Sequence, residues 1–321
     1  MFASPWQLNK RGILGMNRRN ISYISRYNER RLFPLVDNKI KTKVLAEAAN
    51  ISTPKLIGLV ENQYDVNHLA DILKGINGFA IKPAKGSGGK GILVLRRNAE
   101  GEFVKNSGTQ VSISDLQRHV TNILAGLHSL GGNTDVALIE ELIEFDDYLA
   151  GFSFEGVPDI RVIICRGYPV MSMIRLATRA SDGKANLHQG AVGVGLDIAT
   201  GRPLRAVQFG ERVTHHPDTG RDLSELVIPE WPTLLTLAAS CYEISRLGYL
   251  GTDMVLDRNH GPMLLELNAR PGLAIQLANG EGLLHRLRKI DSLKKHELSL
   301  PAKERAALSQ QWFASKKENL L

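Results

Sequence analysis

The chain has 321 residues, a formal net charge of +7 and 43% hydrophobic residues. This composition is typical of a globular protein and argues against a disordered or fibrous one. No apolar run approaches the roughly 20 residues that span a bilayer, and the N-terminus lacks the apolar core of a signal peptide. We therefore expect a cytoplasmic protein that is not inserted in a membrane.

The cysteines and the charge distribution narrow the functional classes. Cys165 and Cys241 lie in apolar runs, and without an export signal two buried thiols are favoured over a disulfide. Lys and Arg residues are spread along the chain, and aromatic residues make up only 6% of it. A phosphate-bearing ligand explains the positive charge at least as well as nucleic acid does.

Short helices and strands are expected in the first half of the chain. Residues 1–36 are basic, carry tyrosines at positions 23 and 27, and predict a short helical arm. Beyond the arm, apolar periodicity and turn residues predict both helices and strands. These are a helix over 41–50, a strand over 56–60, a helix over 66–73, strands over 79–83 and 92–95, a helix over 113–130 and a strand over 137–143.

The second half mixes hairpins with one long helix. The expected elements are strands over 160–165 and 170–177, a glycine-rich, mobile-looking segment over 181–195, a helix over 232–247, and a hairpin of 252–257 with 262–268. The tail beyond residue 290 is charged and prone to helix formation. Because hairpins replace regular βαβ repeats, the sequence favours an α+β fold over a doubly wound sheet.

A glycine-rich loop separates the strands over 79–83 and 92–95. It reads Gly86-Ser87-Gly88-Gly89-Lys90-Gly91 and follows Lys82. A Walker A loop or a dinucleotide fingerprint must open a helix, whereas this loop leads into a strand. The remaining interpretations are an ordinary surface hairpin, or a flexible hairpin whose N–H groups close on phosphate oxygens together with Lys82.

A second hairpin places carboxylates opposite each other. A turn centred on 258–261 pairs Asp257 with Pro262, and the same register puts Asp253 opposite Glu266. Side chains alternate along strands, so Glu266 and Asn268 share a face that Asp253 joins. Two carboxylates and an amide oxygen suit Mg²⁺. The alternative is one carboxylate on a solvated edge and Glu266 paired with a lysine.

Basic and acidic side chains elsewhere suggest further parts of a site. Arg270 follows the second hairpin and would project beside the metal. Arg161 and Arg175 fall on neighbouring strands, where they are either exposed or ready to bind a phosphorylated or carboxylate substrate. The strand end at Glu141 and Leu142 could meet the ribose and the adenine edge of a nucleotide.

In this order, the motifs resemble those of the ATP-grasp superfamily and, within it, the RimK-type glutamate ligases. The closest group is the alpha-L-glutamate ligase-related proteins, and the resemblance covers residues 37–285. It implies two α+β subdomains that grip ATP between them. The segments would be an arm (1–36), an N-subdomain with the glycine-rich lid (37–137), a C-subdomain with the metal site (138–290) and a charged tail (291–321).

The resemblance also assigns roles to individual residues. The expected nucleotide contacts are Lys43 and Lys82 with the ATP phosphates, Gly86, Ser87, Gly88 and Gly89 in the lid, Glu141 and Leu142 at adenine, Asp159 at ribose, and Lys184 and Asn186 beside the phosphates. The expected ligands of Mg²⁺, with Mn²⁺ as an alternative, are Asp253, Glu266 and Asn268. The residues expected at the acyl phosphate or its parent acid are Arg161, Arg175 and Arg270.

Two departures from the RimK pattern leave alternatives open. Only about 36 residues precede the ATP-grasp region, where RimK-type enzymes carry a full α/β domain. The arm or another chain would substitute for that domain. An insertion between Glu141 and Asp159 also lets Asp146 or Asp147 take the ribose role.

The expected function is ATP-dependent ligation of a carboxylate to an amine through an acyl phosphate, with glutamate as one candidate amino acid. Its partners would be small-molecule or peptide acids and amines; a homo-oligomer or a partner chain stays open. A kinase would share most of the ATP site. A rival of another class is a non-catalytic nucleotide- or nucleic-acid-binding protein.

Overall fold

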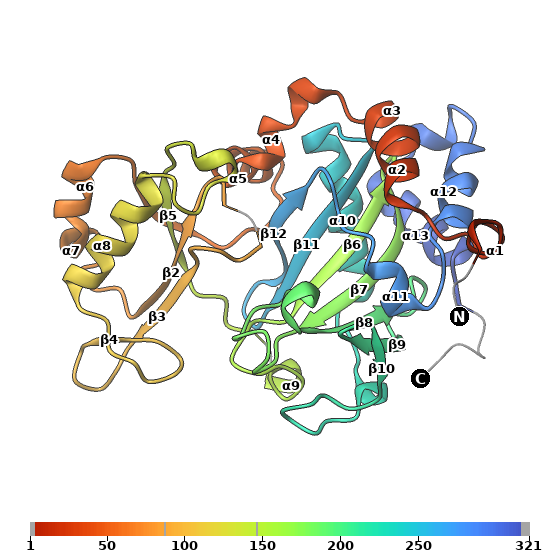
Figure 1. Ribbon diagram of the computed structural model, residues 1–321. Coiled ribbons are helices and arrows are strands. Elements are labelled where there is room, and N and C mark those ends of the chain that lie inside the picture. The colour runs from red at the N-terminus through yellow and green to blue at the C-terminus, as the bar shows by residue number, and fades with distance from the viewer. Residues whose placement is uncertain (1–3, 87, 146, 316–321) are drawn as a thin grey trace. The chain divides into compact units, whose positions relative to one another are not determined.

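The structure is a computed structural model that describes residues 4–86, 88–145 and 147–315 (Figure 1). The chain divides into two compact units. Unit 1 consists of Met1–Asp37, Val44–Ser52 and Phe145–Leu321, and unit 2 consists of Asn38–Lys43 and Thr53–Glu144. Helix α5 (Lys39–Ala48) contributes to both.

Unit 2 is an antiparallel sheet covered by helices. Within the described residues the sheet has five strands in the order β1-β5-β2-β3-β4. The strands are β1 (Leu56–Val60), β2 (Gly78–Pro83), β3 (Leu93–Arg97), β4 (Phe103–Val104) and β5 (Ala137–Glu141), and the helices are α6 (Gln63–Asn67), α7 (Leu69–Ile72), α8 (Ile113–Leu124) and the 3₁₀ turn η3 (Leu130–Gly132). The helices and one face of the sheet enclose a single hydrophobic core.

Helix α8 shows why the chain folds this way locally. Ser112 caps its N-terminus in a capping box with Asp115. Its apolar residues recur at helical spacing and are buried against the sheet. The helix was predicted to run to residue 130 but ends at Leu124, because Gly126 has a left-handed φ of +82° and the carbonyl of Asn133 lies where a β-carbon would be.

The expected hairpin around the glycine loop is confirmed, since β2 and β3 pair antiparallel from Gly78↔Arg96 to Ile81↔Leu93. The division of the chain differs from the expected one. Strand β5 was assigned to the second subdomain, but it pairs with β1 and β2, so the boundary falls after Glu144.

Unit 1 contains a larger antiparallel sheet. Within the described residues it has seven strands in the order β10-β9-β8-β7-β6-β11-β12. The strands are β6 (Asp159–Cys165), β7 (Tyr168–Leu176), β8 (Val192–Leu196), β9 (Pro203–Gln208), β10 (Glu211–Val213), β11 (Tyr249–Asp257) and β12 (Gly261–Asn268). The α+β prediction is confirmed. The segment over 181–195, expected to be mobile, instead leads into β8, which is buried in the sheet.

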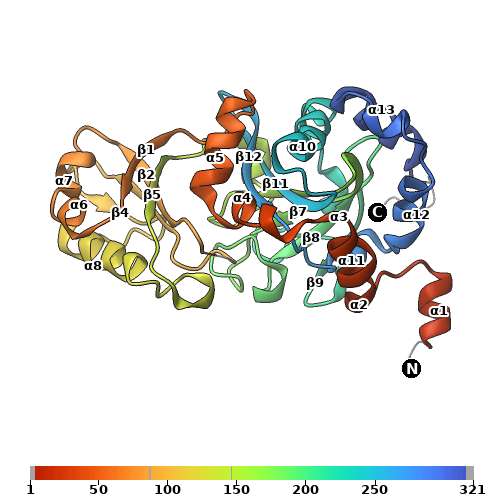
Figure 2. The same ribbon diagram turned by 90° about the horizontal axis from the view of Figure 1, so that it is seen from above.

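Helices lie on both sides of this sheet, as Figure 2 shows with α10 on one side and α11, α2 and α3 on the other. The unit's helices are α1 (Pro5–Lys10), α2 (Met16–Arg18), η1 (Arg19–Ile24), α3 (Ser25–Tyr27), η2 (Arg30–Leu32), α4 (Pro34–Asp37), α9 (Asp147–Ala150), η4 (Leu187–Gln189), η5 (Leu223–Glu225), α10 (Trp231–Ser245), α11 (Ile275–Asn279), α12 (Leu284–Asp291), η6 (Glu297–Ser299) and α13 (Ala302–Trp312). Two further predictions can be compared with the described residues. Cys165 and Cys241 are free and buried, as predicted. No helix in the described part of the chain is long and apolar enough to cross a membrane.

The two ends of the chain are built into unit 1. Tyr23 and Ile24 of the N-terminal arm are buried in its core, and the Asn28 amide bonds both backbone polar groups of Tyr249, at 2.9 and 2.7 Å. In the tail, the Trp312 ring stacks on Tyr168 with 5.6 Å between centroids. The arm is therefore part of the core and not a separate segment.

Candidate active site

The carboxylate hairpin of unit 1 places Asp253 opposite Glu266, as predicted. The expected register near the turn is wrong by one residue, because Asp257 pairs with Gly261 and not with Pro262. A register shift between Asp253 and Met254 leaves Leu265 as the extra residue of a β-bulge. Without this bulge Asp253 would face Leu265, and the Glu266 side chain would project from the other face of the sheet.

Arg161 and Arg175 both bind the Asp253 carboxylate. Arg161 lies opposite Asp253 on the neighbouring strand β6. Its Nε donates to Oδ1 at 2.7 Å and its Nη2 to Oδ2 at 2.5 Å, while Nη2 of Arg175 reaches Oδ2 at 2.9 Å. The predicted convergence of arginines on this sheet is therefore observed, and it is directed at Asp253.

A second carboxylate completes this buried cluster. Asp159 lies opposite Arg175 and accepts from its Nε at 2.5 Å and its Nη2 at 2.6 Å. All four side chains of the cluster (Asp159, Arg161, Arg175 and Asp253) are at most 12% exposed. Asp159 thus forms an ion pair with Arg175. If it also binds a ribose, as expected, it must do so while this ion pair is present.

Burial and neighbouring charges shift the two carboxyl groups in opposite directions. Burial alone would raise the pKa of Asp253, but Arg161 and Arg175 outweigh it and hold that pKa well below the ordinary value. Burial raises the pKa of Asp159, the charge of Asp253 raises it further, and Arg175 only partly offsets this. Asp253 is therefore the carboxylate that stays ionised.

Asn268 and Arg270 close the turn after β12. The Asn268 Oδ1 atom accepts from the backbone N–H of Arg270 at 3.0 Å. The Arg270 guanidinium lies 4.8 Å from the centre of the Phe33 ring and donates to Asp37 at 3.2 Å. Arg270 is half exposed, so its side chain is held by the N-terminal segment and not by the carboxylate cluster.

Whether the predicted metal ligands suit an ion depends on the oxygen lone pairs that they can offer to it. The Asp253 carboxylate has about four lone-pair positions, of which three accept hydrogen bonds, and the fourth is on Oδ1. Carboxylate oxygens of Asp253 and Glu266 and the amide oxygen of Asn268 are the kind of ligand that Mg²⁺ prefers, and their assignment to a metal stays a prediction. The described residues hold no group of three or more His, Cys, Asp or Glu that could bind a metal by themselves. Any such ion would need further oxygen ligands from a substrate or water.

The loop after β7 carries the last expected nucleotide residues of this unit. Lys184 Nζ forms an ion pair with Asp182 at 3.0 Å. Asn186 Oδ1 caps the short turn η4 by accepting from His188 N at 3.0 Å, which leaves its amide N–H groups for another acceptor. Of the alternative ribose residues, Asp146 and the side chain of Asp147 lie outside what the structure describes.

In unit 2, two lysines converge on one carboxylate. Lys43 Nζ lies 2.9 Å from Oε1 of Glu140, and Lys82 Nζ lies 2.7 Å from Oε2. Lys43 also donates to the Pro54 carbonyl. Burial would raise the pKa of Glu140, but Lys82 and Lys43 outweigh it and lower that pKa. This cluster brings together the two lysines that were expected to bind phosphate.

Glu140 was missed in the sequence, where Glu141 was chosen in its place. The signal was the alternation along β5: Lys82 pairs with Leu138, so the side chains of Lys82, Leu138 and Glu140 share a face. Glu141 is about half exposed and forms an ion pair with Lys55 at 3.2 Å. Leu142 packs on β2, where a β-carbon on Gly78 would lie 2.5 Å from it.

The glycine loop is attached at both ends. Lys39 Nζ donates to the Gly86 carbonyl at 2.7 Å, and the ring of His119 bonds the Gly91 carbonyl at 3.1 Å. Gly88 and Gly89 have φ of +65° and +75°, a backbone conformation that glycine adopts most readily. Ser87, the fourth residue expected in the lid, lies outside the described residues.

Two antiparallel α+β units, one with a lysine–carboxylate cluster and a glycine loop and one with a carboxylate hairpin, define the ATP-grasp class of protein. Within that class the chain belongs to the sugar-transfer associated ATP-grasp family, whose model matches residues 18–292. The predicted superfamily is confirmed. The RimK-type assignment and glutamate specificity stay predictions. No curated protein sequence matches the chain.

Solved structures of ATP-grasp ligases resemble the fold at low identity. The ligase PsnB with its minimal precursor is 12% identical with a TM-score of 0.41, over 89% of this chain and 63% of that one. The D-cycloserine synthetase DcsG is 14% identical with a TM-score of 0.49, over 90% and 82%. D-alanyl-alanine synthetase A from Vibrio cholerae O1 biovar eltor is 10% identical with a TM-score of 0.47, over 86% and 66%. The chain thus spans less than two thirds of the PsnB chain, and its class rests on the family model.

Proposed function

We propose that the protein is an ATP-dependent ligase that joins a carboxylate to an amine. The observation that carries this proposal is the pairing of Asp253 with Glu266 beside the two arginines Arg161 and Arg175. Membership of an ATP-grasp family supports it independently. The acid would attack the γ-phosphate of ATP, which breaks the γ-phosphate–ADP bond and gives an acyl phosphate and ADP. The amine would then attack the acyl carbon, and phosphate would leave with its bonding electron pair.

The residues of unit 2 would bind the nucleotide. The ammonium groups of Lys43 and Lys82 would each contact both Glu140 and the phosphates. The glycine loop would donate backbone N–H groups to the phosphates. Glu140 keeps the two ammonium groups close together before a nucleotide arrives, because each lysine bonds a different oxygen of the one carboxylate. No side-chain nucleophile is required, so positioning would supply much of the rate.

The residues of unit 1 would handle the transferred charge. Asp253, Glu266 and Asn268 would hold Mg²⁺, which when bound neutralises phosphate charge. Arg161 and Arg175 would orient Asp253 through the bonds described above and present their remaining N–H groups to the acid. Lys184, Asn186 and Arg270 are the outer candidates for contacts with phosphate or acid.

The substrate class follows from the family and from the resemblance in the sequence. The family is described as associated with sugar transfer, so a saccharide that carries a carboxylate or an amine is one class to screen. Glutamate and other amino acids are the second class, because the motifs resemble glutamate ligases.

Trapping with hydroxylamine tests the ligase directly. The protein is incubated with ATP, Mg²⁺ and each candidate acid in the presence of hydroxylamine, and hydroxamate and ADP are measured. We expect equal amounts of the two products with at least one acid. A stable phosphoester without hydroxamate would instead identify a kinase. Salt-sensitive binding of nucleic acid that survives Asp253→Asn, with no ADP formed, would favour the non-catalytic alternative.

A further inference from the structure

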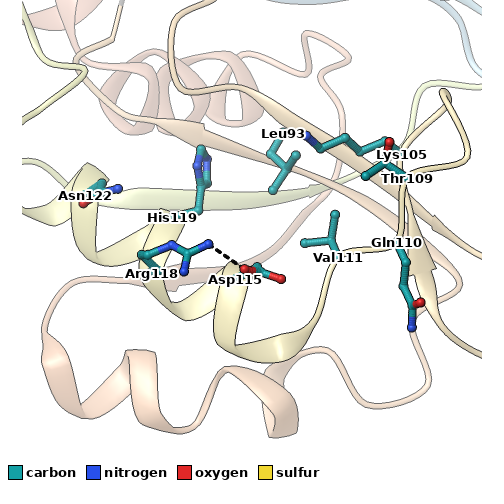
Figure 3. A pocket seen from close by; sticks show the side chains of 9 residues that line it. All are labelled: Leu93, Lys105, Thr109, Gln110, Val111, Asp115, Arg118, His119 and Asn122. Carbon is teal, nitrogen blue, oxygen red and sulfur yellow. Dashed lines mark hydrogen bonds and ion pairs between the residues drawn. The ribbon is translucent and has the colours of Figure 1, made fainter.

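Unit 2 contains a hollow of about 370 Å³ between α8 and the segment that follows β3 and β4 (Figure 3). Two apolar side chains, Leu93 and Val111, contribute to its wall. Its polar lining residues are Lys105, Thr109, Gln110, Asp115, Arg118, His119 and Asn122. None of the residues assigned above to the nucleotide or the metal lines it.

The hollow and the lysine cluster belong to opposite faces of one sheet. Leu93 pairs with Ile81, and both pack in the core beneath the helices. Ala80 pairs with Glu140, so it marks the other face, which also carries Lys82. A ligand in the hollow would therefore not compete directly with a phosphate bound at the lysines.

Positive charge prevails among the lining side chains. Lys105 and Arg118 are cationic, and the one carboxylate, Asp115, is already bonded. It accepts from the Ser112 hydroxyl at 2.7 Å, from the Ser112 backbone N–H at 3.2 Å and from Arg118 at 2.6 Å. Arg118 keeps further N–H groups beyond that bond, because a guanidinium carries five.

Among the described residues, three polar side chains of the hollow have no hydrogen-bond partner in the protein. They are the side chains of Lys105 and Gln110, which are exposed, and of Asn122, which is partly buried. The Lys105 ammonium and the Arg118 guanidinium at one hollow suit a ligand with several acceptor oxygens. The volume is large enough for such a group attached to a small organic molecule.

His119 connects the hollow to the glycine loop. Its Nε2 atom bonds the Gly91 carbonyl at 3.1 Å, and its ring centre lies 5.8 Å from that of His128. Burial lowers the pKa of His119, the bond to Gly91 opposes this, and the charges of His128 and Lys105 lower it further. An anion beside His119 would offset those charges and change how the ring holds the end of the loop.

We propose that this hollow is a second anion-binding site, for the phosphate group of a small phosphate monoester, and that it acts on the glycine loop through His119. The site goes beyond the ligase reaction. Only its effect on catalysis depends on the proposed role of the loop, whereas binding itself does not.

Histidine NMR on the full-length protein tests the binding. The protein is labelled selectively at histidine, and the resonance of His119 is assigned by its loss in His119→Gln. Inorganic phosphate is then titrated at constant ionic strength. We expect a saturable shift of the His119 resonance. In Lys105→Gln/Arg118→Gln, phosphate should bind at least about tenfold more weakly, which corresponds to about 1.4 kcal/mol.

Two control variants separate this site from other sources of the signal. Lys82→Met removes one of the lysines proposed to bind the ATP phosphates, and Arg96→Gln removes an exposed arginine that pairs with Glu144 in the same unit. In both variants the phosphate affinity that the His119 resonance reports should stay within about twofold of the wild-type value. The proposal is overturned if His119 does not respond, if the double variant responds like wild type, or if Lys82→Met abolishes the shift.

Hydrogen exchange tests the connection to the loop. Saturating phosphate should slow amide exchange at Gly88 to Gly91 in wild type and in Lys82→Met, but not in the double variant. If phosphate shifts the His119 resonance in Lys82→Met but does not slow amide exchange at Gly88 to Gly91, the proposed action on the loop is overturned. The ligase proposal is not affected by that result.

Discussion

Asp253 and Glu266 face each other across β11 and β12 because a bulge at Leu265 corrects the register between the turn and the carboxylates. The negative charges of these two carboxylates are not neutralised by each other. Both oxygens of Asp253 are held by Arg161 and Arg175, and the charge of Glu266 also acts on Arg175. These four side chains, which come from the four adjacent strands β7, β6, β11 and β12, thus depend on each other. Their substitution gives the sharpest tests of the proposed function.

Glu266→Gln should abolish Mg²⁺-dependent ADP formation while the protein stays folded. The amide keeps the size of the side chain but removes the charge that a hard divalent cation prefers. The measurement is ADP release against Mg²⁺ concentration, with the melting temperature as a check of folding. Glu211→Gln, on the exposed edge strand β10, is the matched control and should behave as wild type. Turnover of Glu266→Gln at the wild-type rate would falsify the metal assignment.

Arg161→Lys should lower the rate of ADP formation by about 10- to 100-fold. Lysine keeps the charge but cannot give the paired bonds from Nε and Nη2 to Asp253, and one bond between charged groups contributes about 1.5–3 kcal/mol. The steady-state rate at saturating ATP measures this loss. Arg221→Lys makes the same change in an arginine that pairs with Glu225 instead, and it should have little effect. Equal rates in the two variants would contradict the role given to Arg161.

Glu140→Gln should destabilise unit 2 by about 3–5 kcal/mol at pH 7, because it leaves two buried ammonium groups without their carboxylate. The pKa of Glu140 is lowered in the folded protein relative to its value of 4.5 in the unfolded chain. Its stabilising effect is therefore fully present above pH 4.5 and is lost as the pH falls through the lowered pKa. The difference between variant and wild type should shrink accordingly in acid.

Urea unfolding followed by far-ultraviolet circular dichroism measures this difference at several pH values. Tryptophan fluorescence would not report it, since Trp6, Trp231 and Trp312 all belong to unit 1. Glu141→Gln is the adjacent control. Because Glu141 is half exposed, its loss should change the free energy of unfolding by less than about 1 kcal/mol. A pH-independent difference for Glu140→Gln would show that its charge is not the cause.

Gly91→Ala should raise the KM for ATP several-fold. Gly91 has a φ of +74°, and a β-carbon there would lie 2.6 Å from the His128 ring, so the end of the glycine loop must shift. Gly108→Ala carries the same backbone strain, with a φ of +80°, but has open space around it. If both variants change the KM equally, strain and not the contact with His128 is responsible.

Much of the site could be read from the sequence because strand periodicity depends only on neighbouring residues. Alternation placed Glu266 and Asn268 on one face, and the glycine loop was correctly placed between paired strands. The assumed turn register put Asp253 opposite Glu266 only because the bulge at Leu265 offsets its one-residue error. Local patterns also predicted the strand over 56–60 and the long helix that became α10.

The tertiary structure decided what depends on partners distant in the chain. Strand pairing between β2 and β5 determined that Glu140, not Glu141, meets Lys43 and Lys82. Pairing of β6 with β11 brought Arg161 onto Asp253, a residue 92 positions away. The bulge at Leu265 and the burial of the N-terminal arm likewise arise from packing. Alternation within one strand predicts from the sequence which of its own side chains share a face, whereas the energetic balance of the buried charges is set only when separate strands bring them within bonding distance.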